Sequence, residues 1–307
     1  MSWKIFSVIF FIVVVALLAF YWIIPIGRVV NFGYLGNSGD GNSNFTLENG
    51  MVGIQFYENM RYQSSSISYK IDGCPIGKMD EMARAFKTIE DLTTLNFYEA
   101  ADLGEEEISV TCDSSMKVEG RTFIAGEGGV TNVTATDNFN VIFNGKVLLL
   151  RESQCGNPIV GTHELLHALG FDHSINQNNI MYPTINCGQI VGEDMVSYIN
   201  LLYSFPSLPD LSLEDASAST RGNYLDISLT LKNEGLVDSG EARLIVYADG
   251  KNVKEFDVIP VTVGAGRILT LTNIFLLRGS VDEVKLSLDY ASNELNKDNN
   301  IIVLSAN

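Results

Sequence analysis

Residues 163–173 are His-Glu-Leu-Leu-His-Ala-Leu-Gly-Phe-Asp-His, and this stretch determines how the rest of the chain is interpreted. His163 and His167 are four residues apart, so on a helix their imidazoles project from one face and can bind the same ion. Gly170 stands where helices often end with a residue of positive φ, after which the chain can turn and return His173 as a third ligand. Three protein ligands leave a fourth position for water, which is typical of a catalytic rather than a structural zinc site.

The alternative interpretation is that these are ordinary core or surface histidines. The chain has three histidines in 307 residues, and all of them lie in this one pattern, so chance is a poor explanation. Glu164, next to the first histidine, can contact a water on the metal without binding the metal itself. The sequence therefore predicts one catalytic Zn²⁺ ion, with Glu164 as general base and then general acid. Structural Ca²⁺ sites are also compatible with the many oxygen ligands of the chain.

A second short motif follows, Ile180-Met181-Tyr182-Pro183. The histidine motif and this methionine turn together resemble the metzincin metallopeptidases, and the residues of the turn are most similar to those of the matrixin branch. The resemblance implies a zinc-dependent endopeptidase that hydrolyses polypeptides. It also implies that Met181 lies beneath the zinc and that Tyr182 and Pro183 help to form the wall of the primed-side specificity pocket. Tyr182 is not assigned as a ligand, because it directly follows the methionine instead of standing two residues beyond it.

The resemblance covers about residues 51–205. It implies an α+β metzincin-like catalytic domain with a twisted mixed sheet, an antiparallel edge strand to which extended substrate can add, a zinc helix and a Met-turn. Matrixins also hold a second, structural zinc largely by histidine, and no histidine remains here for such a site. The residue pattern itself predicts strands and helices at residues 66–71, 78–95, 107–111, 159–169 and 192–204. Asn144-Gly145 lies between two apolar runs and predicts a hairpin over 138–151, with 138–143 as the outermost edge strand.

Residues 206–307 have a different pattern, in which apolar and polar residues alternate in short runs separated by turns. The pattern predicts an all-β, Ig-like sandwich with a boundary near Pro206. The expected strands cover residues 225–231, 242–248, 253–258, 267–272, 284–288 and 301–304. Segments 231–235, 246–250 and 294–300 resemble the CARDB-type domains of archaeal and bacterial surface proteins. This resemblance implies adhesion or substrate binding through a surface partner, and a spacer or stabilising module is the alternative.

Residues 1–28 differ from the rest of the chain in composition. The 23 residues from Ile5 to Gly27 carry no charge, and about 20 apolar residues span a bilayer as a helix. We therefore predict a transmembrane anchor over 1–28, with the N-terminus in the cytoplasm and the folded domains extracellular. The alternative is a signal peptide whose cleavage releases a secreted protein, although this run is longer than the usual h-region. Residues 29–50 are rich in Gly, Asn and Ser and are predicted to form a flexible linker.

The cysteines are Cys74, Cys112, Cys155 and Cys187, all in the first exported domain. An even count in an exported chain favours two disulfides, for which three connectivities are allowed. We favour the pairs Cys74–Cys112 and Cys155–Cys187, because the second would brace the segments that flank the histidine motif. A zinc site built from cysteines is disfavoured, since the chain has no close Cys-x-x-Cys pair.

The charge of the chain restricts its partners. The net charge is −17, from 37 acidic and 20 basic residues, and it is −19 beyond residue 28. So acidic a chain repels a phosphate backbone, which disfavours nucleic acid and favours a basic or extended protein substrate. Two hypotheses remain: a membrane-anchored zinc endopeptidase, or a surface adhesion protein whose metzincin domain is metal-stabilised and catalytically weak.

Overall fold

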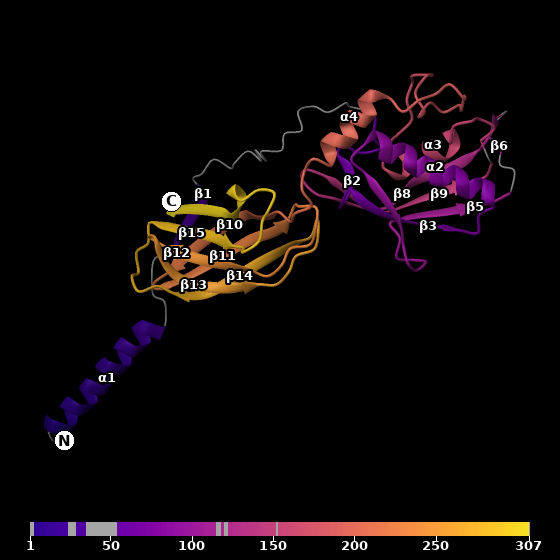
Figure 1. Ribbon diagram of the computed structural model, residues 1–307. Helices are drawn as coiled ribbons and strands as arrows, with labels where there is room; N and C mark the ends of the chain where they lie inside the picture. The colour runs from indigo at the N-terminus through magenta and orange to yellow at the C-terminus, as the bar shows by residue number, and fades with distance from the viewer. Residues whose placement is uncertain are drawn as a thin grey trace. The chain divides into compact units, whose positions relative to one another are not determined.

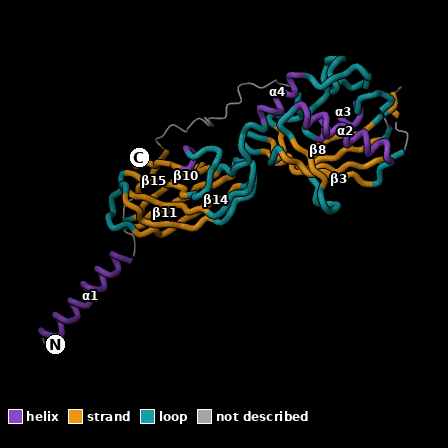
Figure 2. Tube along the Cα trace, in the orientation of Figure 1, coloured by secondary structure: helices purple, strands orange, loops and turns teal. Residues whose placement is uncertain are grey.

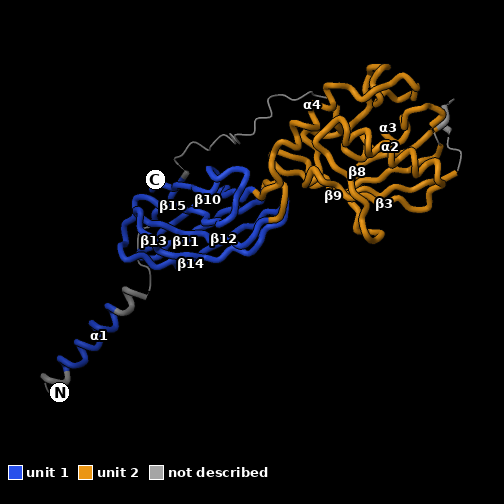
Figure 3. Tube along the Cα trace, viewed as in Figure 1, with its two compact units in different colours: residues 1–42, 210–233, 239–307 blue, residues 43–209, 234–238 orange. Residues whose placement is uncertain are grey.

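The computed structural model describes residues 3–23, 29–34, 54–114, 118–119, 122–151 and 153–306. The chain divides into two compact units, drawn in different colours in Figure 3. One unit holds residues 1–42, 210–233 and 239–307, and the other holds residues 43–209 and 234–238. Each unit has a buried apolar core of its own, so each is described by itself.

The unit that contains the histidine motif combines a mixed sheet with helices (Figures 1 and 2). Its elements are β2 (Met60–Tyr62), β3 (Ser66–Asp72), α2 (Ile76–Leu92), β4 (Asn96–Glu99), β5 (Ile108–Cys112), β6 (Val118–Glu119), β7 (Thr122–Phe123), β8 (Gly126–Ala135), β9 (Asn140–Leu149), α3 (Ile159–Ala168) and α4 (Glu193–Leu202). The strands follow the order β2-β9-β5-β3-β4 and pair in parallel, while β8 pairs with β9 in antiparallel. Helices α2 and α3 lie on the same side of this sheet (Figure 1).

Helix α2 forms where the apolar spacing predicts it. Met82, Phe86 and Ile89 are each at most 3% exposed and contribute to the core, as the i, i+4 and i+7 positions of an amphipathic helix should. The helix ends three residues earlier than predicted. The reason is Thr93, whose backbone N–H and hydroxyl both donate to the carbonyl of Ile89 and leave the chain extended at that point.

The hairpin predicted over 138–151 is wrong, because β9 continues through Asn144-Gly145 without a turn. The glycine is needed for a close contact instead: a Cβ at this position would collide with the Tyr62 hydroxyl and lie 3.0 Å from the Ala168 carbonyl oxygen. The register of β8 against β9 shifts opposite this point. Glycine inside a strand is typical of such a close approach. The antiparallel edge strand that the fold requires is therefore β8 and not 138–143.

Apart from helix α1 (Trp3–Ile23), the other unit is all-β. Its elements are β1 (Val29–Tyr34), β10 (Leu211–Arg221), β11 (Tyr224–Asn233), β12 (Ala242–Ala248), β13 (Lys251–Val258), β14 (Gly266–Phe275), β15 (Glu283–Asp289), the 3-10 helix η1 (Asp298–Asn300) and β16 (Ile301–Ala306). The strands pair in antiparallel as one series, β13-β12-β15-β16-β1-β10-β11-β14. The two outer strands of the series, β13 and β14, contact each other, so the sheet folds around its apolar core. Every strand predicted beyond residue 206 lies within an observed strand.

The segment at 29–34 belongs to this sheet and not to a linker. β1 pairs with β10 on one side and with β16 on the other, and Phe32 is 3% exposed in the core. The prediction of a flexible linker over 29–50 is therefore wrong for its first six residues, and residues 35–50 lie outside the described part of the chain. The strand was not predicted, because its apolar run is short and a stretch rich in Gly, Asn and Ser follows it.

Helix α1 (Trp3–Ile23) forms over the apolar run, and the structure describes its side chains at residues 6–18. In the described part of the chain, no helix is both long and apolar enough to cross a membrane. The structure therefore does not support the transmembrane anchor predicted over 1–28.

Two disulfides join Cys74 to Cys112 and Cys155 to Cys187, which is the pairing favoured from the sequence. The first ties the residues before α2 to the end of β5. The second ties the connection before α3 to the loop that follows the methionine motif. The segments on either side of the histidine motif are thus covalently linked.

Candidate metal centre

The three histidines converge at the end of α3. The Nε2 atom of His167 lies 3.1 Å from Nε2 of His163 and 3.2 Å from Nε2 of His173. Helix α3 supplies the first two side chains, one turn apart, and the loop after it supplies the third. One nitrogen of each ring lies within 4.8 Å of the others, so the three side chains can hold one ion.

Backbone carbonyls fix the orientation of the two buried imidazoles. Nδ1 of His163 lies 2.6 Å from the carbonyl oxygen of Ile180, and Nδ1 of His167 lies 2.8 Å from that of Phe171. Because a carbonyl can only accept, each Nδ1 carries the hydrogen and each Nε2 presents its lone pair to the centre. Burial lowers the pKa of His163 to about 4 and also lowers the pKa of His167. Both rings are therefore neutral near pH 7, as metal ligation requires.

The turn that returns His173 depends on Gly170, which has a φ of 94°. Its N–H donates to the carbonyl of His167, and the N–H of Phe171 donates to that of Leu166, both at 3.0 Å. These two bonds are the Schellman arrangement that ends many helices. A Cβ at Gly170 would also lie 2.8 Å from a side-chain atom of the preceding strand β2. Backbone conformation and packing therefore both require glycine here.

Glu164 is 5% exposed and lies against the edge strand β8. Burial raises the pKa of its carboxyl to about 8, although the N–H of Gly128, which donates to this carboxylate, favours the charged form. The strand comes this close because no side chain intervenes. A Cβ at Gly126 would lie 2.6 Å from Cγ of Glu164, and one at Gly128 would collide with the backbone carbonyl of Glu164. The sequence analysis missed these residues, although Gly-Glu-Gly-Gly over 126–129 is a sign of close backbone approach.

We expect Gly128→Ala to destabilise the domain and to disturb the carboxylate of Glu164. The added methyl group would overlap the carbonyl oxygen of Glu164, so β8 must move away from α3. The N–H of residue 128 would then lose its hydrogen bond to the carboxylate of Glu164. Overpacking of this kind costs about 1–3 kcal/mol of the free energy of unfolding, which urea titration measures. Gly129→Ala is the matched control, because its Cβ would meet nothing within 4 Å. Equal losses in the two variants would contradict the close contact.

The methionine motif forms a tight turn. The N–H of Tyr182 donates to the carbonyl of Asn179 at 3.0 Å, and the N–H of Met181 donates to Oδ1 of Asn179 at 2.8 Å. Met181 is fully buried in the core of the domain. Ile180 supplies the carbonyl that orients His163, so this turn contacts the centre through its backbone. A place for Met181 beneath the metal remains a prediction.

Tyr182 is half-buried and Pro183 is exposed, and their place in a specificity pocket remains a prediction. The loop that follows them is held from inside by Gln189, which is 3% exposed. Its side-chain amide donates to the carbonyl of Thr184 at 2.9 Å and to that of Gln177 at 3.2 Å. Gln189 was not predicted, because one glutamine in a loop carries no pattern.

The segment before β2 lies along the loop between the second and third histidines. The N–H of Phe56 donates to the carbonyl of Gly170, and the N–H of Asp172 donates to that of Ile54. The Phe56 ring stacks on the His167 ring, with centroids 5.7 Å apart and planes 21° apart. This segment fixes both the turn and the outer face of one imidazole. The sequence analysis missed it, because the contact joins residues that are far apart in the chain.

Two parts of the chain match models of known protein families. Residues 61–203 match the matrixin peptidase family, and residues 208–303 match the CARDB family. Among solved structures, the CARDB domain of a Pyrococcus furiosus protein in complex with di-metal ions is similar, at 19% identity and a TM-score of 0.27. The match covers 32% of this chain and 88% of that chain. No curated protein matches the chain. The chain therefore carries a matrixin domain followed by a CARDB domain.

Proposed function

We propose that the protein is a zinc-dependent endopeptidase. The observation that carries the proposal is the convergence of three Nε2 atoms, with the rings of His163 and His167 held by backbone carbonyls. Three imidazole ligands with one open position are the ligand set of catalytic zinc sites. The matrixin match over 61–203 supports the same conclusion, since matrixins are zinc peptidases.

The residues present fit zinc well. The ligands would be His163, His167 and His173, and zinc prefers imidazole nitrogen in a compact tetrahedral arrangement. The carbonyls that receive the Nδ1 hydrogens are the usual outer partners of zinc-binding histidines. When bound, zinc supplies a Lewis acid that polarises the scissile carbonyl and promotes the ionisation of water.

Glu164 is the group that moves the proton. Its carboxylate accepts a proton from the attacking water and passes it to the nitrogen of the leaving amine, so it acts first as base and then as acid. The N–H of Gly128 holds this carboxylate and restricts its rotation. Burial of the side chain excludes bulk water, so the proton is returned to the substrate rather than lost to solvent.

An extended polypeptide fits the other side of the site. Within the described residues β8 pairs only with β9, so its outer edge is open to another strand. A peptide that pairs with β8 would run beside the glycine stretch that contacts Glu164, which brings a peptide bond near the general base. Such pairing uses backbone groups, so it would accept an unfolded protein without a strict sequence preference.

The test uses the full chain, loaded with zinc and incubated with an unfolded protein. We expect one zinc per chain, cleavage within the polypeptide, loss of cleavage with a chelator and recovery when zinc is restored. Zinc bound at one per chain without cleavage of the protein or of a peptide library would contradict the peptidase proposal. That result would favour the second candidate, a binding protein whose matrixin domain is only stabilised by metal.

The CARDB domain gives the second candidate its support, since the family suggests a binding role. In the peptidase, the same domain would bind a surface partner or the substrate. We also propose that the protein works outside the cytoplasm, because two disulfides are typical of exported proteins. Attachment to a membrane through residues 1–28 remains a prediction from the sequence, as do structural Ca²⁺ sites.

A further inference from the structure

Charged side chains of α2 hold the connection that leads from the end of β9 to the start of α3. Lys78, which is 6% exposed, donates from Nζ to the carbonyls of Asp113 at 2.7 Å and of Leu149 and Leu150 at 3.0 Å. A buried ammonium group with three carbonyl partners is fully satisfied. The first residues of the connection are therefore fixed to α2.

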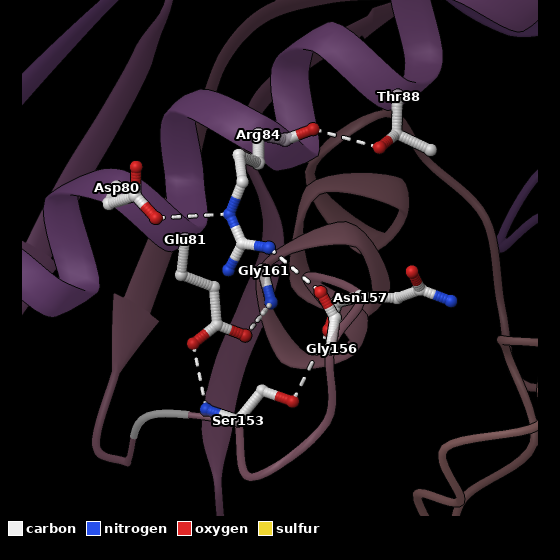
Figure 4. A network of polar contacts seen from close by, with 8 residues as sticks. All are labelled: Asp80, Glu81, Arg84, Thr88, Ser153, Gly156, Asn157 and Gly161. Carbon is white, nitrogen blue, oxygen red and sulfur yellow. Dashed lines mark hydrogen bonds and ion pairs between the residues drawn. The ribbon is translucent and has the colours of Figure 1, made fainter.

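Glu81, one turn further along α2, holds the rest of the connection. It is 2% exposed, and each of its carboxylate oxygens accepts a different backbone N–H (Figure 4). Oε2 lies 2.8 Å from the nitrogen of Ser153, and Oε1 lies 3.3 Å from that of Gly161. Lys78 thus donates hydrogen bonds to backbone carbonyls at the start of the connection. Glu81 accepts hydrogen bonds from backbone N–H groups further along it and in the first turn of α3.

Helix α3 needs this carboxylate because it has no cap of its own. The residue before its first turn is Pro158, which makes no side-chain capping hydrogen bond. The first N–H groups of a helix have no partner within the helix and are costly to bury without one. Gly161 is the third residue of α3, and its N–H donates to the carboxylate of Glu81 instead of to a local cap. A negative charge at this end of a helix is also favourable.

Gly161 is also a point of close approach between the two helices. A Cβ at this position would lie 3.2 Å from Cβ of Ala85 and 3.2 Å from Sδ of Met82, so α2 approaches α3 through the space that the glycine leaves. The position of the first turn of α3 is therefore set by α2. His163 and Glu164 follow Gly161 by two and three residues, so a shift of this turn moves them directly.

We propose that Glu81 is a positioning residue of the metal centre. Its carboxylate fixes the first turn of α3 and so places His163 opposite the other histidines and Glu164 beside β8. It acts through the helix and touches neither the metal nor the substrate. The inference rests on the proposed function insofar as the centre binds a metal, and the residue belongs to no part of the histidine or methionine motifs.

The chemistry of the carboxylate gives a sharp test. Glutamine has the same shape, but it offers one acceptor oxygen and an NH₂ group in place of two acceptors. In Glu81→Gln one of the two backbone N–H groups must therefore face another donor. Asp80→Asn is the matched control, because it also removes a negative charge from α2. Asp80 pairs with Arg84 at the surface, 3.0 Å from its Nε, and holds no backbone N–H of α3 (Figure 4).

The measurement is metal binding by the full chain. Cobalt(II) is titrated into the metal-free protein, its visible absorption spectrum reports the ligand geometry, and zinc affinity follows from competition. We expect Glu81→Gln to weaken zinc binding by about 10–100-fold, as loss of outer partners usually does, and to change the cobalt spectrum. We expect kcat to fall with little change in KM, and Asp80→Asn to behave as wild type in every measurement.

Unchanged zinc affinity and an unchanged cobalt spectrum in a folded Glu81→Gln protein would overturn the inference, even if thermal stability falls. If that variant does not fold, Glu81→Asp takes its place: it keeps both oxygens but is one methylene shorter, and we expect an intermediate loss of affinity. Wild-type affinity in Glu81→Asp would then overturn the inference. A wild-type chain that binds cobalt at the histidines but cleaves nothing would reject the peptidase proposal alone, because the metal-binding comparison would still decide the role of Glu81.

Discussion

The Glu164→Gln variant is expected to bind one zinc ion per chain and to cleave unfolded protein about 10²–10⁴-fold more slowly than wild type. The amide keeps the size of the side chain and still fits between α3 and β8, where Gly126 and Gly128 leave room for it. It cannot accept the proton of the attacking water, so the hydrolytic step loses its base. The metal ligands are untouched, which is why binding and turnover should separate.

Two measurements decide this prediction, zinc content after dialysis and the initial rate of cleavage. Glu193→Gln serves as the control, since Glu193 is an exposed acid in the first turn of α4 and lies outside the metal centre. Wild-type turnover by Glu164→Gln would mean that another group moves the proton. Loss of zinc together with turnover would mean that Glu164 supports the ligand set itself.

Replacing His167 with alanine is expected to remove both functions at once. His167 is the middle member of the cluster, since its Nε2 lies near those of both other histidines. Its loss leaves two ligands. It also removes the ring N–H that donates to the carbonyl of Phe171. Outer-partner substitutions already cost about 10–100-fold in metal affinity, and loss of a ligand should cost more. Zinc content should fall well below one per chain, and cleavage should disappear.

The control for His167→Ala is Asn178→Ala, in the same loop region as His173. Asn178 is exposed, and its backbone makes the hydrogen bonds that hold the loop to Asn176 and Ile190. Alanine preserves that backbone, so metal content and turnover should stay at wild-type levels. Retention of stoichiometric zinc and of cleavage by His167→Ala would refute the assignment of the three-histidine centre.

The convergence of the three histidines could be predicted from the sequence, because the information for it is local. His163, His167 and Gly170 lie on one helix and its end, where a spacing of four residues and a requirement for positive φ are enough to place them. The favoured cysteine pairs are also present in the structure. The strands beyond residue 206 follow from alternation along each strand.

The features that were missed depend on contacts between distant segments. Asn144-Gly145 has the local chemistry of a turn, but Gly145 serves a close contact with Tyr62 and Ala168, and neighbouring strands on both sides keep β9 straight. Glu81 caps a helix that begins 78 residues later, and no periodic pattern in the sequence predicts a contact between such distant residues. The strand β1 has few residues and lies next to a segment of linker-like composition.

That first strand has a mechanical consequence. β1 precedes the matrixin domain in the chain, yet it lies in the middle of the CARDB sheet, with β16 on one side through pairs such as Phe32–Ala306. The domain over 61–203 is therefore an insertion in topological terms. A tension applied between Val29 and the C-terminal strand would pass across the ladder between β1 and β16. None of the three histidines belongs to this ladder, so we expect β1 to leave the sheet before tension along the chain reaches them.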